Sequence, residues 1–243
     1  MERSNSRSRS IAMSYTSKIY DAFFGDKEGT VQYLDFILRY LKKGPILDCA
    51  CGSGDLLLML QEEMPADGLD LDKSMLEIAR SKGVKGKLIQ QDMKEEWNLT
   101  NKYGGIVCIG DSLNYLNSLE EVESFLIQVK KYLIPQGIFI LDMHSLDRLS
   151  EFEEGYLEEA YIDDLEVSWQ VTSYQNQLHH QFLFYDIEEY PTIEHIVQTV
   201  FNPKDIENIL NKLSLKFTVK TDFDKEGYQK GEKYFYIIER GDL

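Results

Sequence analysis

The chain has 243 residues, 43% of them hydrophobic, which is enough for one large domain, or a domain with an insertion, around a sizeable core. A formal net charge of -16 and an isoelectric point near 4.7 disfavour binding to nucleic acid or anionic membranes, because those partners are themselves negative. The sequence lacks both the roughly 18 apolar residues of a membrane span and the apolar core of a secretion signal, so a cytoplasmic protein is expected.

The N-terminal part of the chain is predicted to contain a tail and one helix. Residues 1–14 are rich in serine and arginine and are expected to be flexible. Apolar residues at helical spacing then predict a helix that ends before Gly44. Its apolar face consists of Val31, Leu34, Ile37, Leu38 and Leu41.

Residues 46–60 predict a strand, a tight turn and a helix. The apolar run ends in Asp48, and Gly52 and Gly54 allow the backbone to turn closely before an apolar helix begins. A dinucleotide-binding turn would carry its third glycine at position 55, which is Asp55 here. Because Asp48 would repel a pyrophosphate and attract a cation, a nicotinamide dehydrogenase is disfavoured.

Two further strands are predicted to end in acids. Asp70 follows a short strand about 20 residues after the turn, the spacing at which a carboxylate binds ribose hydroxyls. Asp72 is interpreted as the N-cap of the next helix. Asp92 ends the following apolar run, where it either contacts a ligand or caps a turn. A Gly-x-Gly turn near one acid arises by chance in many α/β proteins, whereas three acids at successive strand ends do so far less readily.

The alternation of strands and helices continues to about residue 142 and predicts a parallel sheet. A strand at 105–109 opens into a polar loop, and Ser118-x-x-Glu121 forms a capping box that predicts the next helix. The strand at 138–142 follows.

The pattern changes over residues 148–200. Short alternating runs rich in aromatic residues, such as 166–171 and 181–185, predict antiparallel strands. Asn202 and Pro203 then predict the start of a last helix, and closing strands are predicted at 215–221 and 233–239.

The motif Asp48-x-Ala50-x-Gly52-x-Gly54 resembles the first motif of class I S-adenosylmethionine-dependent methyltransferases, with Ala50 in place of the first glycine. Residues 68–72 and the helix after them resemble the second motif of that family, and 111–115 are similar to a segment of bacterial small-molecule methyltransferases. The resemblance implies an α/β fold with a Rossmann-like, seven-stranded, mostly parallel sheet flanked by helices and covered by an inserted antiparallel β layer.

The resemblance also implies domain boundaries and ligand contacts. Residues 15–147 and 202–243 would form the methyltransferase domain, and 148–201 the inserted lid. Asp48 would attract the amino group of the S-adenosylmethionine cofactor, Asp70 would hold its ribose, and Leu71 is a further expected cofactor contact. The other expected cofactor contacts are Ala50, Gly52 and Gly54 at the turn, Asp92 and Met93 at the adenine, Asp111 near the methyl donor, and Tyr20 closing over the site.

The sequence gives fewer indications of which residues contact the methyl acceptor. Tyr20, Tyr115 and His195 are the candidates for contact with the acceptor, and His144 follows the fifth strand at the same end of the sheet. A His or Tyr could take a proton from an amine or a phenol. Structural alternatives remain open: Tyr20 could anchor the first helix, and His195 or His144 could be a half-buried structural histidine.

The cysteine and histidine patterns do not predict a metal site. Cys49, Cys51 and Cys108 are an odd set, and the first two are spaced unlike a C-x-x-C pair, so reduced packing thiols are expected. His179 and His180 are adjacent and would face opposite sides of a strand.

The resulting hypothesis is a methyltransferase that moves a methyl group from S-adenosylmethionine to a nitrogen or oxygen of a small molecule. Methylation of a protein or an RNA, and a non-catalytic cofactor-binding scaffold, remain alternatives. Nucleic-acid and membrane partners are not expected, and a homodimer is compatible with a sequence that does not fix the oligomeric state.

Overall fold

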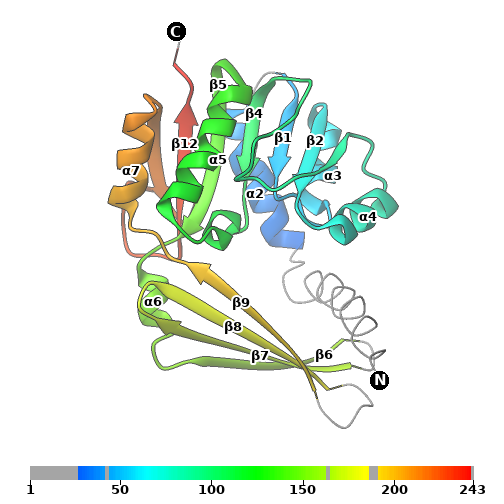
Figure 1. The fold of residues 1–243 in the computed structure, drawn as a ribbon, viewed down its shortest axis with the longest axis vertical. Helices are drawn as coiled ribbons and strands as arrows, with labels where there is room; N and C mark the ends of the chain where they lie inside the picture. The colour runs from blue at the N-terminus through cyan, green and yellow to red at the C-terminus, as the bar shows by residue number, and fades with distance from the viewer. Residues whose placement is uncertain (1–26, 42–43, 163–164, 186–190, 242–243) are drawn as a thin grey trace, which may run out of the picture.

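The computed structural model describes residues 27–41, 44–162, 165–185 and 191–241. Two β-sheets and their helices account for this part of the chain (Figure 1). No helix within it is long and apolar enough to cross a membrane.

The larger sheet has eight strands among the described residues, in the order β11-β10-β12-β5-β4-β1-β2-β3. Neighbours from β3 to β5 pair in parallel, whereas β12, β10 and β11 pair antiparallel. The mostly parallel α/β sheet is therefore confirmed, with one strand more than the seven expected, because the two-residue β11 pairs with β10. The strands are β1 (Ile46–Cys49), β2 (Ala66–Asp70), β3 (Leu88–Gln90), β4 (Tyr103–Cys108), β5 (Leu133–His144), β10 (Lys216–Thr221), β11 (Lys225–Glu226) and β12 (Lys233–Glu239).

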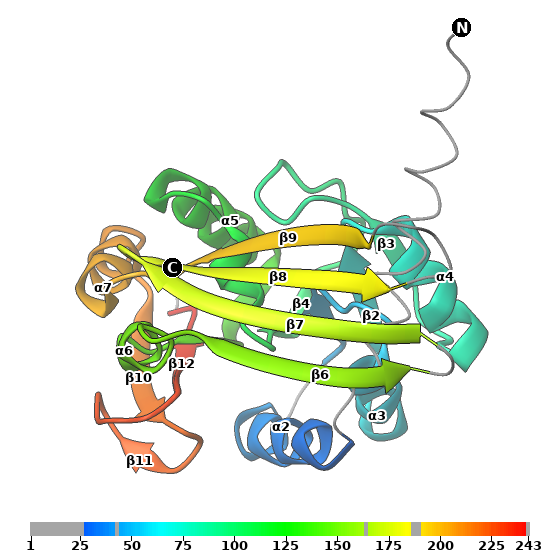
Figure 2. The same ribbon diagram turned by 90° about the horizontal axis from the view of Figure 1, so that it is seen from below.

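Helices cover both faces of this sheet (Figure 2). One apolar core joins the sheet to α5 and α7, and a second joins it to α2, α3 and α4. Three helices begin at side-chain caps, since Asp72, Ser118 and Asn202 each accept a hydrogen bond from a backbone N–H in the first turn. The helices are α2 (Lys27–Tyr40), α3 (Asp55–Glu63), α4 (Lys73–Lys82), η1 (Ser112–Tyr115, a 3-10 helix), α5 (Leu119–Tyr132), α6 (Asp147–Glu151) and α7 (Pro203–Lys212).

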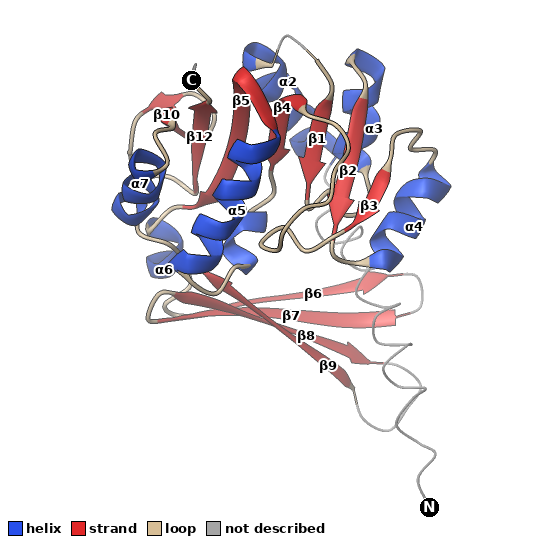
Figure 3. Ribbon diagram, turned by 45° about the horizontal axis from the view of Figure 1, so that its top comes forward, coloured by secondary structure: helices blue, strands red, loops and turns tan. Residues whose placement is uncertain are grey.

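The smaller sheet is antiparallel, with the order β6-β7-β8-β9. It lies across the carboxyl ends of the parallel strands, as the expected inserted layer would (Figure 3). The face bearing Trp169 packs on α6, where Phe152 and Val171 are buried together. Its strands are β6 (Tyr156–Ile162), β7 (Leu165–Tyr174), β8 (Gln177–Tyr185) and β9 (Thr192–Thr199).

One element differs from its predicted packing. The apolar face of α2 was expected to include Val31, but that side chain is 41% exposed, and Phe36 is buried instead. The reason is tertiary, because Phe36 packs against the rings of Phe223 and Phe235 from the far end of the chain.

Candidate functional site

A pocket of about 490 Å³ lies at the carboxyl ends of the parallel strands. This volume is typical of small-molecule and cofactor sites. Four segments that are distant in sequence form its wall: the turn after β1, the end of β2, the segment after β3, and η1. Their contributions are Ala50 and Gly52; Asp70, Leu71 and Asp72; Gln91, Asp92 and Met93; and Ser112 and Tyr115.

The turn between β1 and α3 has left-handed backbone at Ala50, Gly52 and Gly54, with φ of 57°, 51° and 85°. Open space surrounds the position of a Cβ at Gly52, so the bare backbone there forms a cradle at the pocket wall. At Gly54 a Cβ would lie 2.8 Å from the Cβ of Ala79, so glycine is needed for α3 and α4 to approach. The sequence departure at Ala50 therefore places a β-carbon on strained backbone.

Asp70 connects two walls of the pocket. Its Oδ2 accepts a hydrogen bond from the backbone N–H of Gly52 at 2.8 Å, and its Oδ1 accepts one from the N–H of Asp72 at 2.8 Å. Burial raises the pKa of Asp70, while these two hydrogen bonds oppose the shift. Each carboxylate oxygen has two lone pairs, so both can still accept a hydrogen bond from a ligand hydroxyl.

Asp48 lies behind the pocket rather than in its lining and is only 3% exposed. Burial, together with the charge of Asp70, raises the pKa of Asp48 to about 8. A buried carboxyl group with this shift favours a cationic ligand, whose charge would stabilise the ionised form.

Asp92 and Met93 both line the pocket. The Oδ1 of Asp92 accepts a hydrogen bond from the N–H of Lys94 at 3.1 Å, so the residue also caps a turn. The Met93 carbonyl accepts a hydrogen bond from the indole N–H of Trp97 at 2.9 Å. The sequence alternatives for Asp92, ligand contact and turn cap, are thus compatible with each other.

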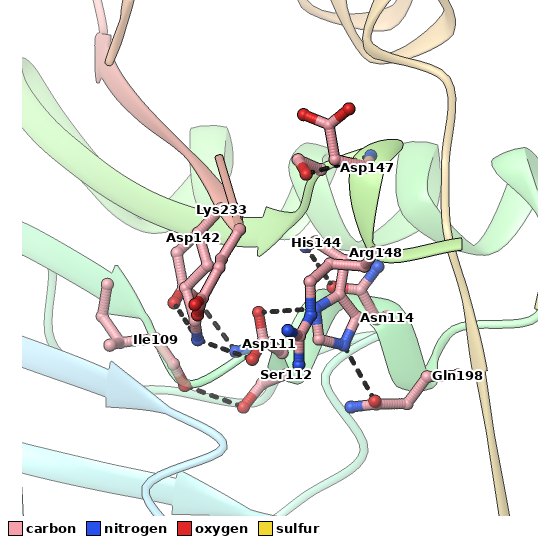
Figure 4. Close-up of polar contacts among 12 residues, drawn as sticks. Ile109, Asp111, Ser112, Asn114, Asp142, His144, Asp147, Arg148, Gln198 and Lys233 are labelled. Atoms are coloured by element: carbon pink, nitrogen blue, oxygen red, sulfur yellow. Dashed lines mark hydrogen bonds and ion pairs between the residues drawn. The ribbon is translucent and has the colours of Figure 1, made fainter. Parts of the chain in front are cut away.

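Asp111 does not line the pocket, contrary to its expected position, although its neighbour Ser112 does. Its Oδ2 lies 2.5 Å from the Nζ of Lys233, and its Oδ1 lies 3.3 Å from the Nδ1 of His144 (Figure 4). The backbone at Asp111 is left-handed, with φ of 60°, which carries its side chain into this buried group.

Lys233 also contacts Asp142 and Tyr33, and these five residues, Tyr33, Asp111, Asp142, His144 and Lys233, are called the buried polar cluster below. Burial lowers the pKa of Lys233, but the two aspartates outweigh it and raise that pKa well above its usual range. For Asp111, the charge and hydrogen bond of Lys233 outweigh burial and lower the pKa, whereas burial raises the pKa of Asp142.

Three residues of this cluster, Tyr33, Asp142 and Lys233, were not predicted as site residues from the sequence. Asp142 could have been found, because it is a further acid near the end of a predicted strand. Lys233 and Tyr33 carry no local signal, since β12 and α2 lie far from η1 in the sequence.

The acceptor-side candidates are dispersed. Tyr115 lines the pocket and is 38% exposed. His195 is exposed on β9 and stacks on His179, on the face of the small sheet opposite the one that bears His180. His144 is buried in the polar cluster, and Tyr20 lies outside the described residues.

The three cysteines are free and buried. Burial raises the pKa of the Cys49 and Cys108 thiols well above the usual range, which disfavours the reactive thiolate.

The pocket fits S-adenosylmethionine. A bare-backbone cradle at Gly52, a hydrogen-bonded carboxylate at Asp70 and the uncompensated carboxyl group of Asp48 suit a ligand with a ribose and positive charge.

Comparison with known proteins agrees with this geometry. Residues 46–137 match the family described as "Methyltransferase domain". A relative from Bacillus subtilis (strain 168), named "Putative methyltransferase YqeM", is 28% identical over 210 residues, covering 82% of this chain and 85% of the relative.

Solved structures share the fold. An S-adenosylmethionine-dependent methyltransferase from Clostridium acetobutylicum ATCC 824 has a TM-score of 0.80 and 24% identity, covering 95% of this chain and 100% of its own. CalS10, an amino pentose methyltransferase from Micromonospora echinaspora, has a TM-score of 0.73 and 17% identity, covering 91% of this chain and 96% of its own. Residues 46–137 therefore match a methyltransferase domain, and the chain shares the fold of S-adenosylmethionine-dependent methyltransferases.

Proposed function

We propose that this enzyme methylates a nitrogen or oxygen atom of a small molecule, with an amine as the favoured acceptor. The observation that carries the proposal is the antiparallel sheet β6–β9, which lies across the carboxyl ends of the parallel strands where the cofactor pocket is found (Figure 1). The similar structure of an amino pentose methyltransferase supports an amine acceptor. The net charge of -16 also favours a cationic or neutral acceptor over an anionic polymer.

We further propose roles for the pocket residues on the donor side. Asp70 would bind the ribose hydroxyls, next to Leu71. Asp92 and Met93 would hold the adenine, and Gly52 would let the cofactor approach the backbone. Asp48 would stabilise the positive charge of the amino group, because its carboxyl group is buried and its pKa is raised by burial and by the charge of Asp70.

When bound, S-adenosylmethionine supplies an electrophilic methyl group on a sulfonium sulfur. Held by Asp70, Asp92 and Gly52, the cofactor would supply this methyl group to the acceptor lone pair, with the sulfur as the leaving group. The acceptor then loses one proton. The protein would contribute alignment and exclusion of water, and Tyr115, which lines the pocket, is the described candidate for contact with the acceptor.

The test is turnover of the full chain with S-adenosylmethionine and a panel of small amines, phenols and amino sugars. We expect S-adenosylhomocysteine release with at least one amine, together with a product that has gained one methyl group. Turnover confined to protein or RNA fractions would contradict the proposal. Cofactor binding without turnover on any acceptor would instead favour a non-catalytic scaffold.

A further inference from the structure

The short helix η1 has two sides with different partners. Ser112 and Tyr115 line the cofactor pocket. Asn114, between them, is completely buried on the other side. η1 therefore contacts the pocket on one side and strand β9 of the small sheet on the other.

Asn114 links β5 and β9 directly. Its Oδ1 accepts a hydrogen bond from the backbone N–H of His144 at 3.0 Å, and its Nδ2 donates one to the carbonyl of Thr199 at 2.7 Å. Both polar ends of the buried amide are thus satisfied, one on the large sheet and one on the last residue of β9. A displacement of β9 would leave the buried Nδ2 of that amide without its acceptor, which is unfavourable.

His144 makes a second link beside the first. Its Nε2 lies 2.9 Å from the Oε1 of Gln198 on β9, and its Nδ1 lies 3.3 Å from the Oδ1 of Asp111 (Figure 4). Gln198 and His144 are 6% and 5% exposed, so water does not easily replace these contacts. Asp111 directly precedes η1 and is fixed by Lys233.

We propose that Asn114 and His144 are positioning residues that couple β9 of the small sheet to the wall of the cofactor pocket. They act through η1, because β6–β9 contribute no described residue to the pocket lining. The coupling is reciprocal: cofactor binding that orders η1 stabilises the docked position of β9, and the docked sheet tightens cofactor binding. The proposal rests on the cofactor pocket but not on the identity of the acceptor.

The experiment measures both directions of the coupling in the full chain. Calorimetry gives the affinity for S-adenosylhomocysteine, and amide hydrogen exchange of residues 192–199 is compared with and without that ligand. In the parent we expect the ligand to slow exchange in β9 by about fivefold or more, the lower end of typical coupling.

The key variant is Gln198→Leu, which removes the oxygen facing His144. We expect its affinity for S-adenosylhomocysteine to fall about five- to tenfold and the ligand-dependent slowing in β9 to disappear. Gln170→Leu is the matched control, the same substitution at an exposed position of β7, and should behave like the parent. Gln198→Glu keeps an acceptor oxygen and should restore both effects.

The possible results distinguish failure of the cofactor-pocket assignment from failure of the coupling between β9 and the pocket. A parent that does not bind S-adenosylhomocysteine would overturn the pocket assignment and the coupling together. A parent that binds the ligand without slower exchange in β9 would overturn the coupling alone, whether or not Gln198→Leu folds. Unchanged affinity and unchanged slowing in a folded Gln198→Leu variant would also overturn it.

Discussion

At the scale of single residues, Asp70 combines a structural role with a proposed role in binding the cofactor. Its carboxylate holds the N–H groups of Gly52 and Asp72, which belong to different walls of the pocket. A substitution at Asp70 therefore alters both the shape of the pocket and the proposed ribose contact, and the choice of side chain decides how much of each is lost.

Asp70→Ala should weaken S-adenosylhomocysteine binding by about 10- to 100-fold, because hydrogen bonds to a charged group contribute roughly 1.5–3 kcal/mol. Asp70→Asn keeps one acceptor oxygen and should lose less affinity for S-adenosylhomocysteine than Asp70→Ala. Glu77→Ala, an exposed acid on α4, is the control and should leave the affinity unchanged. Calorimetry measures all three, and an affinity in Asp70→Ala equal to that of the parent would remove the ribose assignment.

Asp48 should make cofactor binding depend on pH. With its pKa near 8, the free protein carries this carboxyl group largely protonated at pH 6, and the ammonium group of the ligand would favour its ionised form. Binding then releases a proton, so affinity for S-adenosylhomocysteine should rise between pH 6 and 8, by at most about tenfold per unit. Calorimetry across this range should show the slope in the parent and a flat profile in Asp48→Asn. The same slope in both would contradict the assignment.

The raised pKa of Asp48 also affects the stability of the folded chain. Between about pH 4 and pH 8 the folded chain binds the Asp48 proton more tightly than the unfolded chain does. This group therefore lowers the free energy of unfolding as the pH rises through that window. Urea unfolding at pH 5 and pH 8 should show Asp48→Asn gaining stability relative to the parent at the higher pH, by roughly 3–4 kcal/mol. A difference in the free energy of unfolding between the two proteins that does not change with pH would contradict this prediction.

At the scale of elements, the turn between β1 and α3 depends on left-handed backbone at three alternate positions. Ala50 and Gly54 share that conformation but have different surroundings. Gly54 packs against Ala79 and Val84 of the α4 region, whereas Ala50 already accommodates a β-carbon. Opposite substitutions at the two positions therefore separate backbone strain from steric contact.

Gly54→Ala should lower the free energy of unfolding by about 3 kcal/mol, the sum of left-handed strain and an overpacked contact. Ala50→Gly should be neutral or stabilising by up to about 1 kcal/mol, because strain is relieved while the unfolded chain gains entropy. Urea denaturation of both variants measures these values. Equal destabilisation by the two substitutions would show that the turn geometry is wrong.

At the scale of the whole molecule, the buried polar cluster joins parts of the chain that are up to 200 residues apart. Lys233 on β12 is surrounded by Tyr33 from α2, Asp111 before η1 and Asp142 on β5. Its ammonium group compensates two buried carboxylates. Packing alone would not hold these residues together, because burying an uncompensated charge is costly.

Lys233→Met should lower the free energy of unfolding by about 3–5 kcal/mol, since it leaves two buried carboxylates without their cation. Adding Asp111→Asn to that variant should recover part of the loss. Lys225→Met removes an exposed ion pair with Asp222 and should cost no more than about 1 kcal/mol. Urea unfolding compares the three, and similar losses for the two lysine variants would show that the cluster is solvated.

The features that the sequence predicted are those with local physical causes. The caps at Asp72, Ser118 and Asn202 were found because a cap depends on residues within one turn of the helix. The pocket positions of Asp70 and Asp92 followed from the rule that parallel strands end at the same edge of a sheet. The parallel sheet and the antiparallel layer were likewise readable from alternation and period.

Only the tertiary structure decided the features that depend on distant partners. It placed Asp111 against Lys233 rather than in the pocket, turned His195 to the exposed face of β9, and buried Phe36 in place of Val31. Hydrophobic period and turn chemistry act over a few residues and leave a trace in the sequence. Charge compensation and ring packing act between segments that meet only in the folded chain, so the sequence alone does not specify which residues pair.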